Sequence, residues 1–211
     1  GVFSDKNVVT GKTGTITSSY TGADVSNYSV TDQSSTTANI TAKSLTVSGI
    51  TASSKTYDGS VTATMDGTSA VYSGLVSGDT FTGSYTGVFA NANVGTGKTV
   101  TITSSYSGAD AGNYSITDQS TTTADISVKA LTATASASNK TYDGATTATT
   151  TLTFTGLVGS ETLGQTVGST FDNKNVGSNK TVTVNSITLA DGTNGGLAAN
   201  YSISTGQTTT A

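Results

Sequence analysis

The chain has 211 residues, a net charge of −4 and a hydrophobic content of only 33%, and it lacks Cys, His, Trp and Pro altogether. These absences exclude disulfides, thiolate chemistry and histidine-based catalysis, and so small a net charge argues against a disordered chain. All nine basic residues are lysines in a chain of acidic balance, which argues against a nucleic-acid partner, and no apolar run approaches the ~20 residues of a membrane span.

The first residues of the chain already belong to a repeat. Residues 1–42 match the second half of a longer repeat, because residues 12–20 align with residues 98–106. Polar and apolar residues alternate in this segment, which predicts a half-buried strand with Val100 facing the core. Gly14 stands in the place of Val100 in the first copy, so we expect a weaker strand there.

The pattern Ile-x-x-Lys-x-Leu marks the junctions between repeats, at Lys43 and Lys129. We therefore divide the chain into the C-terminal half of a first repeat (1–42), a complete repeat domain (43–128) and a repeat domain without its last strand (129–211). Two extended segments abut at each junction with no Gly between them, so we expect a short linker and a semi-rigid rod.

The complete repeat predicts an all-β domain. Its short apolar segments are separated by Gly- and Asp-rich turns, and only residues 189–199, in the next repeat, could hold a single helical turn. This pattern favours tandem small Ig-like β-sandwiches, with a β-grasp fold as the alternative. The candidate strands are 45–50, 61–65, 80–85, 99–104, 113–117 and 123–128.

Three short motifs recur at nearly one spacing. Lys-Thr-Tyr-Asp-Gly begins at Lys55 and at Lys140, and we interpret it as a tight turn in which Gly takes a positive φ and Tyr anchors the packing. The predicted turn residues are Tyr57, Asp58, Gly59, Tyr142, Asp143 and Gly144. Asn-Tyr-Ser, and a Phe followed by Asn-Val, supply the predicted repeat-packing residues Tyr28, Tyr114, Tyr201, Phe3, Phe89 and Phe171.

The sequence predicts neither an enzyme nor a metal site. No base or nucleophile of the usual kinds is present, and no pair of acids recurs between repeats. Four acids lie in Gly-rich loops but form no Asp-x-Asp-x-Asp cluster, so we expect no calcium and no other cofactor. These acids are Asp24, Asp79, Asp110 and Asp191. A Lys–Asn isopeptide crosslink at Lys98 or Lys180 stays open, although it needs a buried carboxylate and Glu161 is the only Glu.

The full set of motifs resembles the YDG-type repeat of large bacterial surface proteins, many of which are similar to filamentous-haemagglutinin adhesins. The resemblance rests on the motif at 55–59, on Gly74-Leu75, on Asn93-Val94-Gly95 and on Asn113-Tyr114-Ser115. It implies an extracellular, secreted β-protein at the bacterial cell surface, acting as a stalk or a self-assembling fibre in attachment. The alternative is an adhesive module that binds a carbohydrate or a protein receptor.

The resemblance also implies partners. Neighbouring repeats or copies of the same chain are expected to pack on one another, and a host or cell-surface receptor is a further candidate. Because residues 1–42 carry only half a repeat, their strand edges would be unpaired. Head-to-tail strand complementation, in which one chain supplies a strand to the sheet of the next, is one way to fill them.

Overall fold

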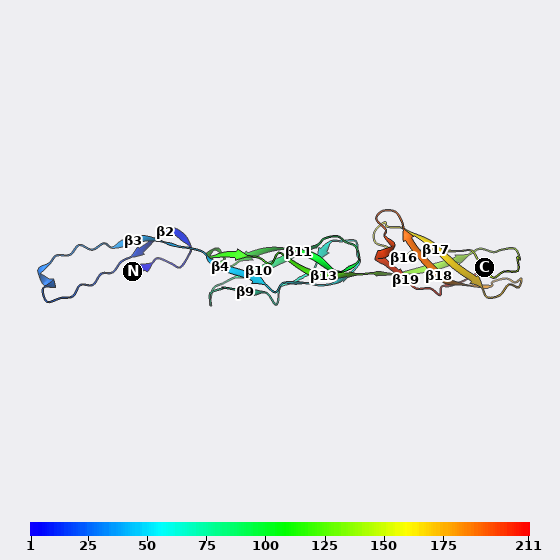
Figure 1. Ribbon diagram of the computed structural model, residues 1–211, viewed down its shortest axis with the longest axis horizontal. Coiled ribbons are helices and arrows are strands. Elements are labelled where there is room, and N and C mark those ends of the chain that lie inside the picture. The colour runs from blue at the N-terminus through cyan, green and yellow to red at the C-terminus, as the bar shows by residue number, and fades with distance from the viewer. The chain divides into compact units, whose positions relative to one another are not determined.

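The structure, a computed structural model, describes all residues from 1 to 211, and its regular secondary structure consists mainly of β-strands (Figure 1). The exceptions are loops and three 3-10 turns of three residues each. The expectation of an all-β chain made of small tandem β-domains is therefore confirmed, whereas the Ig-like topology stays a prediction. No helix is long and apolar enough to cross a bilayer.

The backbone divides into two compact units, and both are discontinuous in sequence. Unit 1 comprises Gly1–Thr51, Met65–Thr86 and Ile102–Thr122, and unit 2 comprises Ala52–Thr64, Gly87–Thr101 and Thr123–Ala211. The middle repeat, 43–128, thus contributes residues to both units. The boundaries at Lys43 and Lys129 stay a prediction.

The N-terminal segment of unit 1 forms a three-stranded antiparallel sheet. Its strands, in the order β1-β2-β3, are β1 (Val2–Phe3), β2 (Val9–Thr15) and β3 (Ser35–Ile40). β2 ends one residue after Gly14, whereas the corresponding strand of the middle repeat, β11 (Gly95–Ser107), continues much further.

The rest of unit 1 is built around β4 (Lys43–Ser48). It pairs in parallel with β12 (Tyr114–Thr117) and antiparallel with β9 (Val71–Ser73). Val47, Ile50 and Ile102 form the buried core here, with several half-buried aromatic rings packed against them. β5 (Thr51–Ala52) pairs with β8 (Met65–Asp66) in a separate two-stranded sheet.

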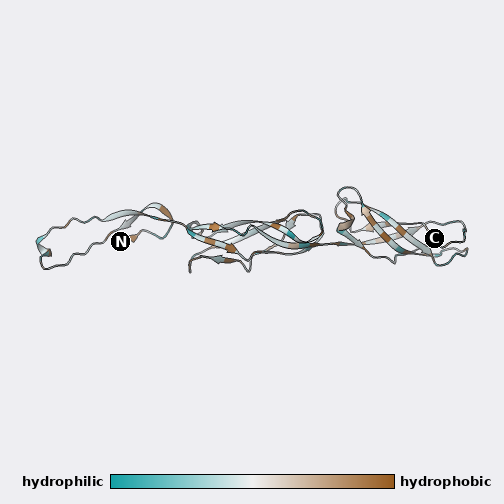
Figure 2. Ribbon diagram, in the orientation of Figure 1, coloured by the Kyte–Doolittle hydropathy of each residue, from teal (hydrophilic) through white to brown (hydrophobic).

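The middle repeat also contains a five-stranded sheet in the order β6-β13-β11-β10-β7. The strands joining β11 are β6 (Lys55–Thr56), β7 (Thr62–Ala63), β10 (Thr82–Phe89) and β13 (Thr121–Ser127). Its apolar residues alternate with polar ones along the strands (Figure 2), and Phe89, Val100 and Ile126 are fully buried. The inward orientation predicted for Val100 is therefore confirmed.

Unit 2 repeats this arrangement with β14 (Lys129–Ala137) in the place of β4. β14 pairs antiparallel with β16 (Thr150–Thr155) and in parallel with β19 (Tyr201–Ile203). A second sheet runs β15-β17-β18-β20, with β15 (Thr147–Ala148), β17 (Leu163–Phe171), β18 (Thr181–Asp191) and β20 (Thr208–Thr210). The core residues of this unit include Leu131, Leu152, Val182 and Val184.

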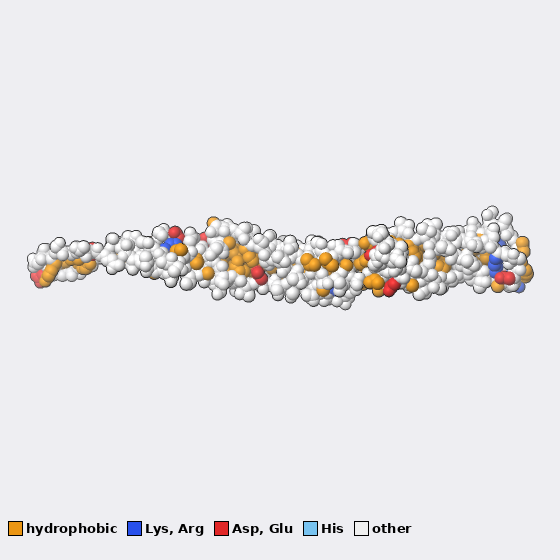
Figure 3. All heavy atoms as spheres, turned by 90° about the horizontal axis from the view of Figure 1, so that it is seen from above, with side chains coloured by type: hydrophobic (Ala, Val, Ile, Leu, Met, Phe, Trp, Pro, Cys, Tyr) orange, Lys and Arg blue, Asp and Glu red, His pale blue; other side chains and the backbone are white.

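Each of the three helical turns ends at the Asn of an Asn-Tyr pair. They are η1 (Val25–Asn27), η2 (Ala111–Asn113) and η3 (Ala198–Asn200), and η3 lies where the sequence allowed a single helical turn. Each places the Asn at the end of the turn and starts an extended segment at the Tyr. The outer surface is mostly uncharged, and the face drawn in Figure 3 carries only scattered Lys, Asp and Glu side chains.

Candidate functional site

The first Lys-Thr-Tyr-Asp-Gly motif closes into a tight turn. Gly59 takes φ +76°, a conformation that residues with side chains rarely adopt. The Ser60 N–H donates to Asp58 Oδ1 at 2.8 Å. Lys55 Nζ lies 2.7 Å from Asp58 Oδ1, which holds the pKa of that carboxyl below its usual value, and 5.5 Å from the centre of the Phe89 ring. Lys55 therefore links the turn to the recurring Phe.

The second copy of the motif has the same geometry. Gly144 has φ +78°, and the Ala145 N–H donates to Asp143 Oδ1 at 2.9 Å. Lys140 Nζ lies 2.9 Å from Asp143 Oδ1 and 5.7 Å from the Phe171 ring centre. The Lys, Asp and Gly of the motif thus build the same turn in both copies.

The two motif tyrosines lie in opposite environments. Tyr57 is only 4% exposed, because its ring packs edge-to-face on Tyr201 with the centroids 5.4 Å apart. Its hydroxyl donates to Glu161 Oε1 at 2.6 Å, and the Tyr201 hydroxyl donates to Glu161 Oε2 at 2.5 Å. Both partners belong to the following repeat. Tyr142, at the same place in the next motif, is 58% exposed.

A recurring Asn makes a second contact between the same two repeats. Asn200 is 1% exposed, and its Oδ1 accepts the backbone N–H of Val94 at 3.0 Å. Its Nδ2 donates to Asn93 Oδ1 at 3.2 Å. The Asn-Val loop of one repeat is therefore bound by the Asn-Tyr turn of the next, and both polar groups of the buried amide are satisfied.

Unit 1 contains the same contact between the first repeat and the middle one. The Val8 N–H donates to Asn113 Oδ1 at 2.9 Å, and Asn113 Nδ2 donates to Asn7 Oδ1 at 3.4 Å. The first copy has Val9 where the others have Gly, but the bonded N–H belongs to Val8, so this departure leaves the contact unchanged.

A carboxylate binds the Tyr of the Asn-Tyr turn at each contact. Asp79 Oδ2 accepts from the Tyr114 hydroxyl at 2.5 Å, and the same hydroxyl accepts the Val76 N–H at 3.0 Å. Glu161 takes the place of Asp79 in the following repeat and likewise accepts from Tyr201. The recurring Tyr thus connects a backbone N–H to a carboxylate in both repeats.

The comparisons with known proteins agree with this reading of the repeat. The model of the family described as YDG domain matches residues 41–124 and 127–211. The chain belongs to the YDG domain family. No curated protein matches the chain, and neither does any solved structure.

The charges between YDG repeats differ from one contact to the other. In unit 1, Lys6 Nζ lies 2.6 Å from Asp79 Oδ1 and 2.7 Å from Asp110 Oδ1. Hydrogen bonding to these carboxylates raises the pKa of Lys6, and Lys6 in turn lowers the pKa of both acids. At the other contact, Ala92 and Leu197 occupy the positions of Lys6 and Asp110.

The acids considered for calcium are accounted for in part by these contacts. Asp79 and Asp110 bind Lys6, and nowhere does the chain gather three or more Asp, Glu, His or Cys side chains into one group. Asp24 is exposed, and Asp191 Oδ1 accepts the Ala198 N–H at 2.8 Å.

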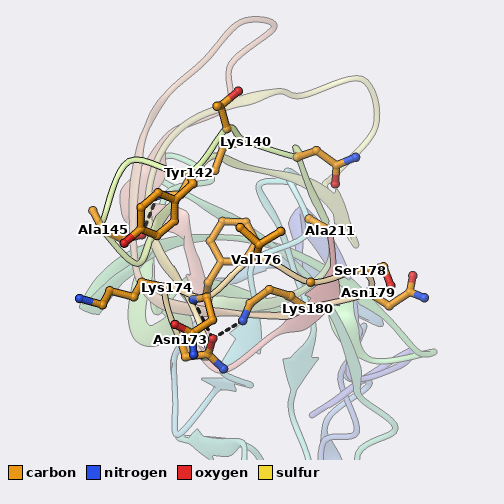
Figure 4. A pocket seen from close by; sticks show the side chains of 15 residues that line it. Lys140, Tyr142, Ala145, Asn173, Lys174, Val176, Ser178, Asn179, Lys180 and Ala211 are labelled. Carbon is orange, nitrogen blue, oxygen red and sulfur yellow. Dashed lines mark hydrogen bonds between the residues drawn. The ribbon is translucent and has the colours of Figure 1, made fainter.

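The lysines considered for a crosslink secure the Asn-Val loops. Lys98 Nζ donates to Asn91 Oδ1 at 2.7 Å, and Lys180 Nζ donates to Asn173 Oδ1 at 2.5 Å. Glu161 accepts from tyrosine hydroxyls and makes no hydrogen bond to either lysine. Lys98 thus binds the loop that docks on the next YDG repeat, and Lys180 binds the corresponding loop of its own repeat (Figure 4).

The predicted repeat-packing residues are likewise divided into buried and exposed ones. Phe89, Tyr114 and Tyr201 are buried, whereas Tyr28 is 73% exposed. Phe3 is partly exposed and Phe171 is half-buried.

The sequence analysis did not identify the docking asparagines, although each recurs at every copy of its motif. The sequence does carry a signal for them: one Asn recurs in the Asn-Val loop and another in the Asn-Tyr turn, and two amides that recur together can bind each other. The missed residues are Asn7, Asn93, Asn113, Asn200 and Lys6.

Substituting the two motif glycines should separate the cost of backbone strain from the cost of a steric clash with the following repeat. Gly59→Val places a Cβ at positive φ and 2.8 Å from Val158 Cγ1, whereas a Cβ at Gly144 meets nothing within 4 Å. Backbone strain costs about 1–3 kcal/mol at either position. The steric clash adds about 1–3 kcal/mol for Gly59→Val alone. Denaturant unfolding followed by circular dichroism measures both, and equal losses would show that Val158 relaxes at no cost.

High pH should weaken the Tyr57 contact. Burial, and then hydrogen bonding to Glu161, raises the pKa of Tyr57 from 10.0 to about 12, and burial raises the pKa of Tyr201 as well. The folded state holds these protons more tightly, so the stabilisation is complete below pH 10 and is lost as the pH rises through about 12. The free energy of unfolding measured across this range should fall for the wild type and fall less for Tyr57→Phe. The same pH dependence in the wild type and in Tyr57→Phe would contradict a stabilising role for the Tyr57 hydroxyl.

Proposed function

We propose that the chain is a structural repeat segment of a bacterial extracellular adhesin or filament, in which YDG repeats form a semi-rigid stalk for cell-surface attachment. The observation that carries the proposal is the contact made by Asn113 in unit 1 and again by Asn200 in unit 2. A stalk needs every repeat to hold its neighbour in the same way, and this contact is built from residues that recur in each copy.

The chemistry of the contact favours a fixed joint over a flexible linker. Asn200 is almost completely buried with both ends of its amide bonded, and a buried amide that lost its partners would be costly. Tyr57 adds a buried aromatic contact and a hydrogen bond to a carboxylate across the same junction. Bending at this junction would therefore break several interactions together.

The aromatic residues favour the stalk over a receptor-binding module. Phe81 stacks on Tyr106 at 5.2 Å, and Tyr85 lies 6.5 Å from Tyr106, within the core of the middle repeat. In the following repeat, Leu163 takes the place of Phe81 and Val167 takes the place of Tyr85. An aromatic groove that binds a glycan would be expected in every repeat, whereas Phe81 and Tyr85 have no aromatic counterpart in the following repeat.

The test is a replacement in the cell that produces the protein. The 211-residue segment is exchanged for unrelated β-domains of equal total length, with a shortened segment as the control. A stalk predicts that adherence survives the exchange, falls with shortening, and is accompanied by labelling of intact cells with antibodies against the segment. Loss of adherence in the equal-length replacement would favour the receptor-binding module instead.

A further inference from the structure

The first strand of each repeat begins where a pull along the chain would enter it. Only Thr41 and Ala42 separate the end of β3 from the start of β4, and only Val128 separates β13 from β14. Tension transmitted through the backbone therefore reaches the first strand of a repeat directly, because no flexible loop precedes it that could lengthen first.

Each of these first strands has a parallel partner later in the same repeat. Four residue pairs join β4 to β12, beginning with Lys43 and Tyr114. Three residue pairs join β14 to β19, beginning with Lys129 and Tyr201. In both repeats the pairing thus starts at the residue where the chain enters the strand, and the partner of that residue is the Tyr of the Asn-Tyr turn.

The last strand of the middle repeat is also held by a parallel partner. Ile126 and Ser127 of β13 pair with Lys55 and Thr56 of β6, and the Ser127 carbonyl accepts the Tyr57 N–H at 2.9 Å. The chain leaves the middle repeat at this end of β13. The middle repeat therefore has one parallel pair at its entry and another at its exit.

The direction of the β4–β12 pair decides how tension acts on it. In a parallel pair, the N-terminal end of one strand and the C-terminal end of the other lie at opposite ends of the pair. Tension that enters at the N-terminal end of β4 and leaves through the C-terminal end of β12 therefore acts along the strands, and their hydrogen bonds share it. In an antiparallel hairpin the two loaded ends lie side by side, so the bonds open one after another.

Buried side chains oppose the sliding of β4 along its partner. Leu45 is fully buried and Val47 is 2% exposed, so both side chains point from β4 into the core. A shift of one residue along the strand would turn both of them to the opposite face. A pull that breaks the pair must therefore also remove these two side chains from the core.

The Tyr that pairs with the entry residue is anchored by its own side chain. Tyr114 is 8% exposed, and its hydroxyl donates to Asp79 and accepts the Val76 N–H. The Tyr201 hydroxyl accepts the Val158 N–H at 2.9 Å in the same way. The partner strand is therefore fixed to the rest of its repeat at the point where it first takes the load.

We propose that each repeat bears tension through the parallel pair of its first strand, β4–β12 in the middle repeat and β14–β19 in the next, with the Tyr of the Asn-Tyr turn as the anchor of that pair. The inference deepens the proposed stalk function and rests on it for the source of the tension. The two fail separately, because the adherence experiment replaces the whole segment, whereas the tests of load bearing pull on single purified molecules.

The first test pulls the middle repeat in two directions with optical tweezers. The chain has no Cys, so two engineered cysteines define the points at which the force acts. Ala42→Cys with Val128→Cys loads the repeat from end to end, whereas Ala42→Cys with Ser115→Cys pulls β4 and β12 apart at the same end. The end-to-end pull should need roughly three times the force, because four residue pairs then share the load.

The two cysteine variants control for stability. All three substituted positions are exposed, so denaturant unfolding should give the same free energy for both variants, and a difference in force then reports on the direction of the pull alone. Equal forces in the two directions, or a smaller force from end to end, would overturn the proposal.

The second test examines the Tyr anchor at constant end-to-end force. Tyr114→Phe removes the hydroxyl that binds Asp79 and the Val76 N–H, so it should raise the unfolding rate about tenfold. Tyr106→Phe is the matched control, because its hydroxyl also donates to a carboxylate, that of Asp118, but Tyr106 lies on β11 outside the β4–β12 pair. It should raise the rate much less. An equal effect of the two variants would mean that resistance to force follows overall stability, and would overturn the role of Tyr114 as the anchor.

Discussion

Tyr57→Ala is expected to lower the free energy of unfolding by about 3–5 kcal/mol, the range for removing a large buried aromatic ring. The ring is buried against Tyr201 and its hydroxyl binds Glu161, so the substitution removes packing and leaves a carboxylate with one partner fewer. Tyr142→Ala is the matched control at the same place in the next motif. Because Tyr142 is 58% exposed, its loss should stay within about 0.5 kcal/mol.

Tyr57→Phe separates the hydrogen bond from the packing. It keeps the ring against Tyr201 and removes only the hydroxyl, so the loss should be about 1–3 kcal/mol. Denaturant unfolding followed by circular dichroism measures all three variants. If Tyr57→Ala and Tyr142→Ala lowered stability equally, the motif Tyr would act within its own repeat and the contact with the following repeat would carry no weight.

Asn200→Ala is expected to cost about 2–4 kcal/mol, because it leaves both the Val94 N–H and Asn93 Oδ1 without their buried partner. Asn113→Ala should cost less, because Asn113 is half-buried and water can reach its partners. Asn27→Ala should leave the unfolding of the monomer unchanged, because Asn27 is exposed. The three variants therefore form a graded series at one repeat position.

The order within this series is the informative outcome, again from denaturant unfolding. Asn200→Asp provides a further control, since it keeps an acceptor for the Val94 N–H but loses the donor to Asn93 Oδ1. A loss for Asn27→Ala as large as that for Asn200→Ala would mean that the Asn stabilises its own turn and not the contact between repeats.

The sequence predicted the local structure well where short-range chemistry determines it. Alternation placed Val100 and Ile102 in a strand and both are buried. The requirement for positive φ placed Gly59 and Gly144 in turns, and both have it. The short strands β5 and β9 gave no signal, and the single strand predicted over 61–65 is divided between β7 and β8, because strands of two or three residues are fixed by their partners and not by their own pattern.

The contacts between repeats were beyond local reasoning. Tyr57 and Tyr142 have the same neighbours in sequence, yet one is buried and the other is exposed. The difference comes from residues more than 100 positions away, since Tyr57 and Glu161 are separated by 104 residues. Periodicity and turn propensity report on a few residues at a time, so they predict the turn and leave its partner undetermined.

The separation between the docking residues has a consequence for how the chain matures. Val94 binds Asn200 across 106 residues, and Val8 binds Asn113 across 105, so each partnership is longer than one motif period. A chain that emerges from a ribosome or an export channel with its N-terminus first must therefore deliver most of the next repeat before the previous one can bind it. The Asn-Val loop of each repeat is therefore uncovered until the next repeat has folded. Folding cooperativity then passes between neighbouring repeats along the chain. We therefore expect unfolding to begin at the terminal repeat that no following repeat contacts.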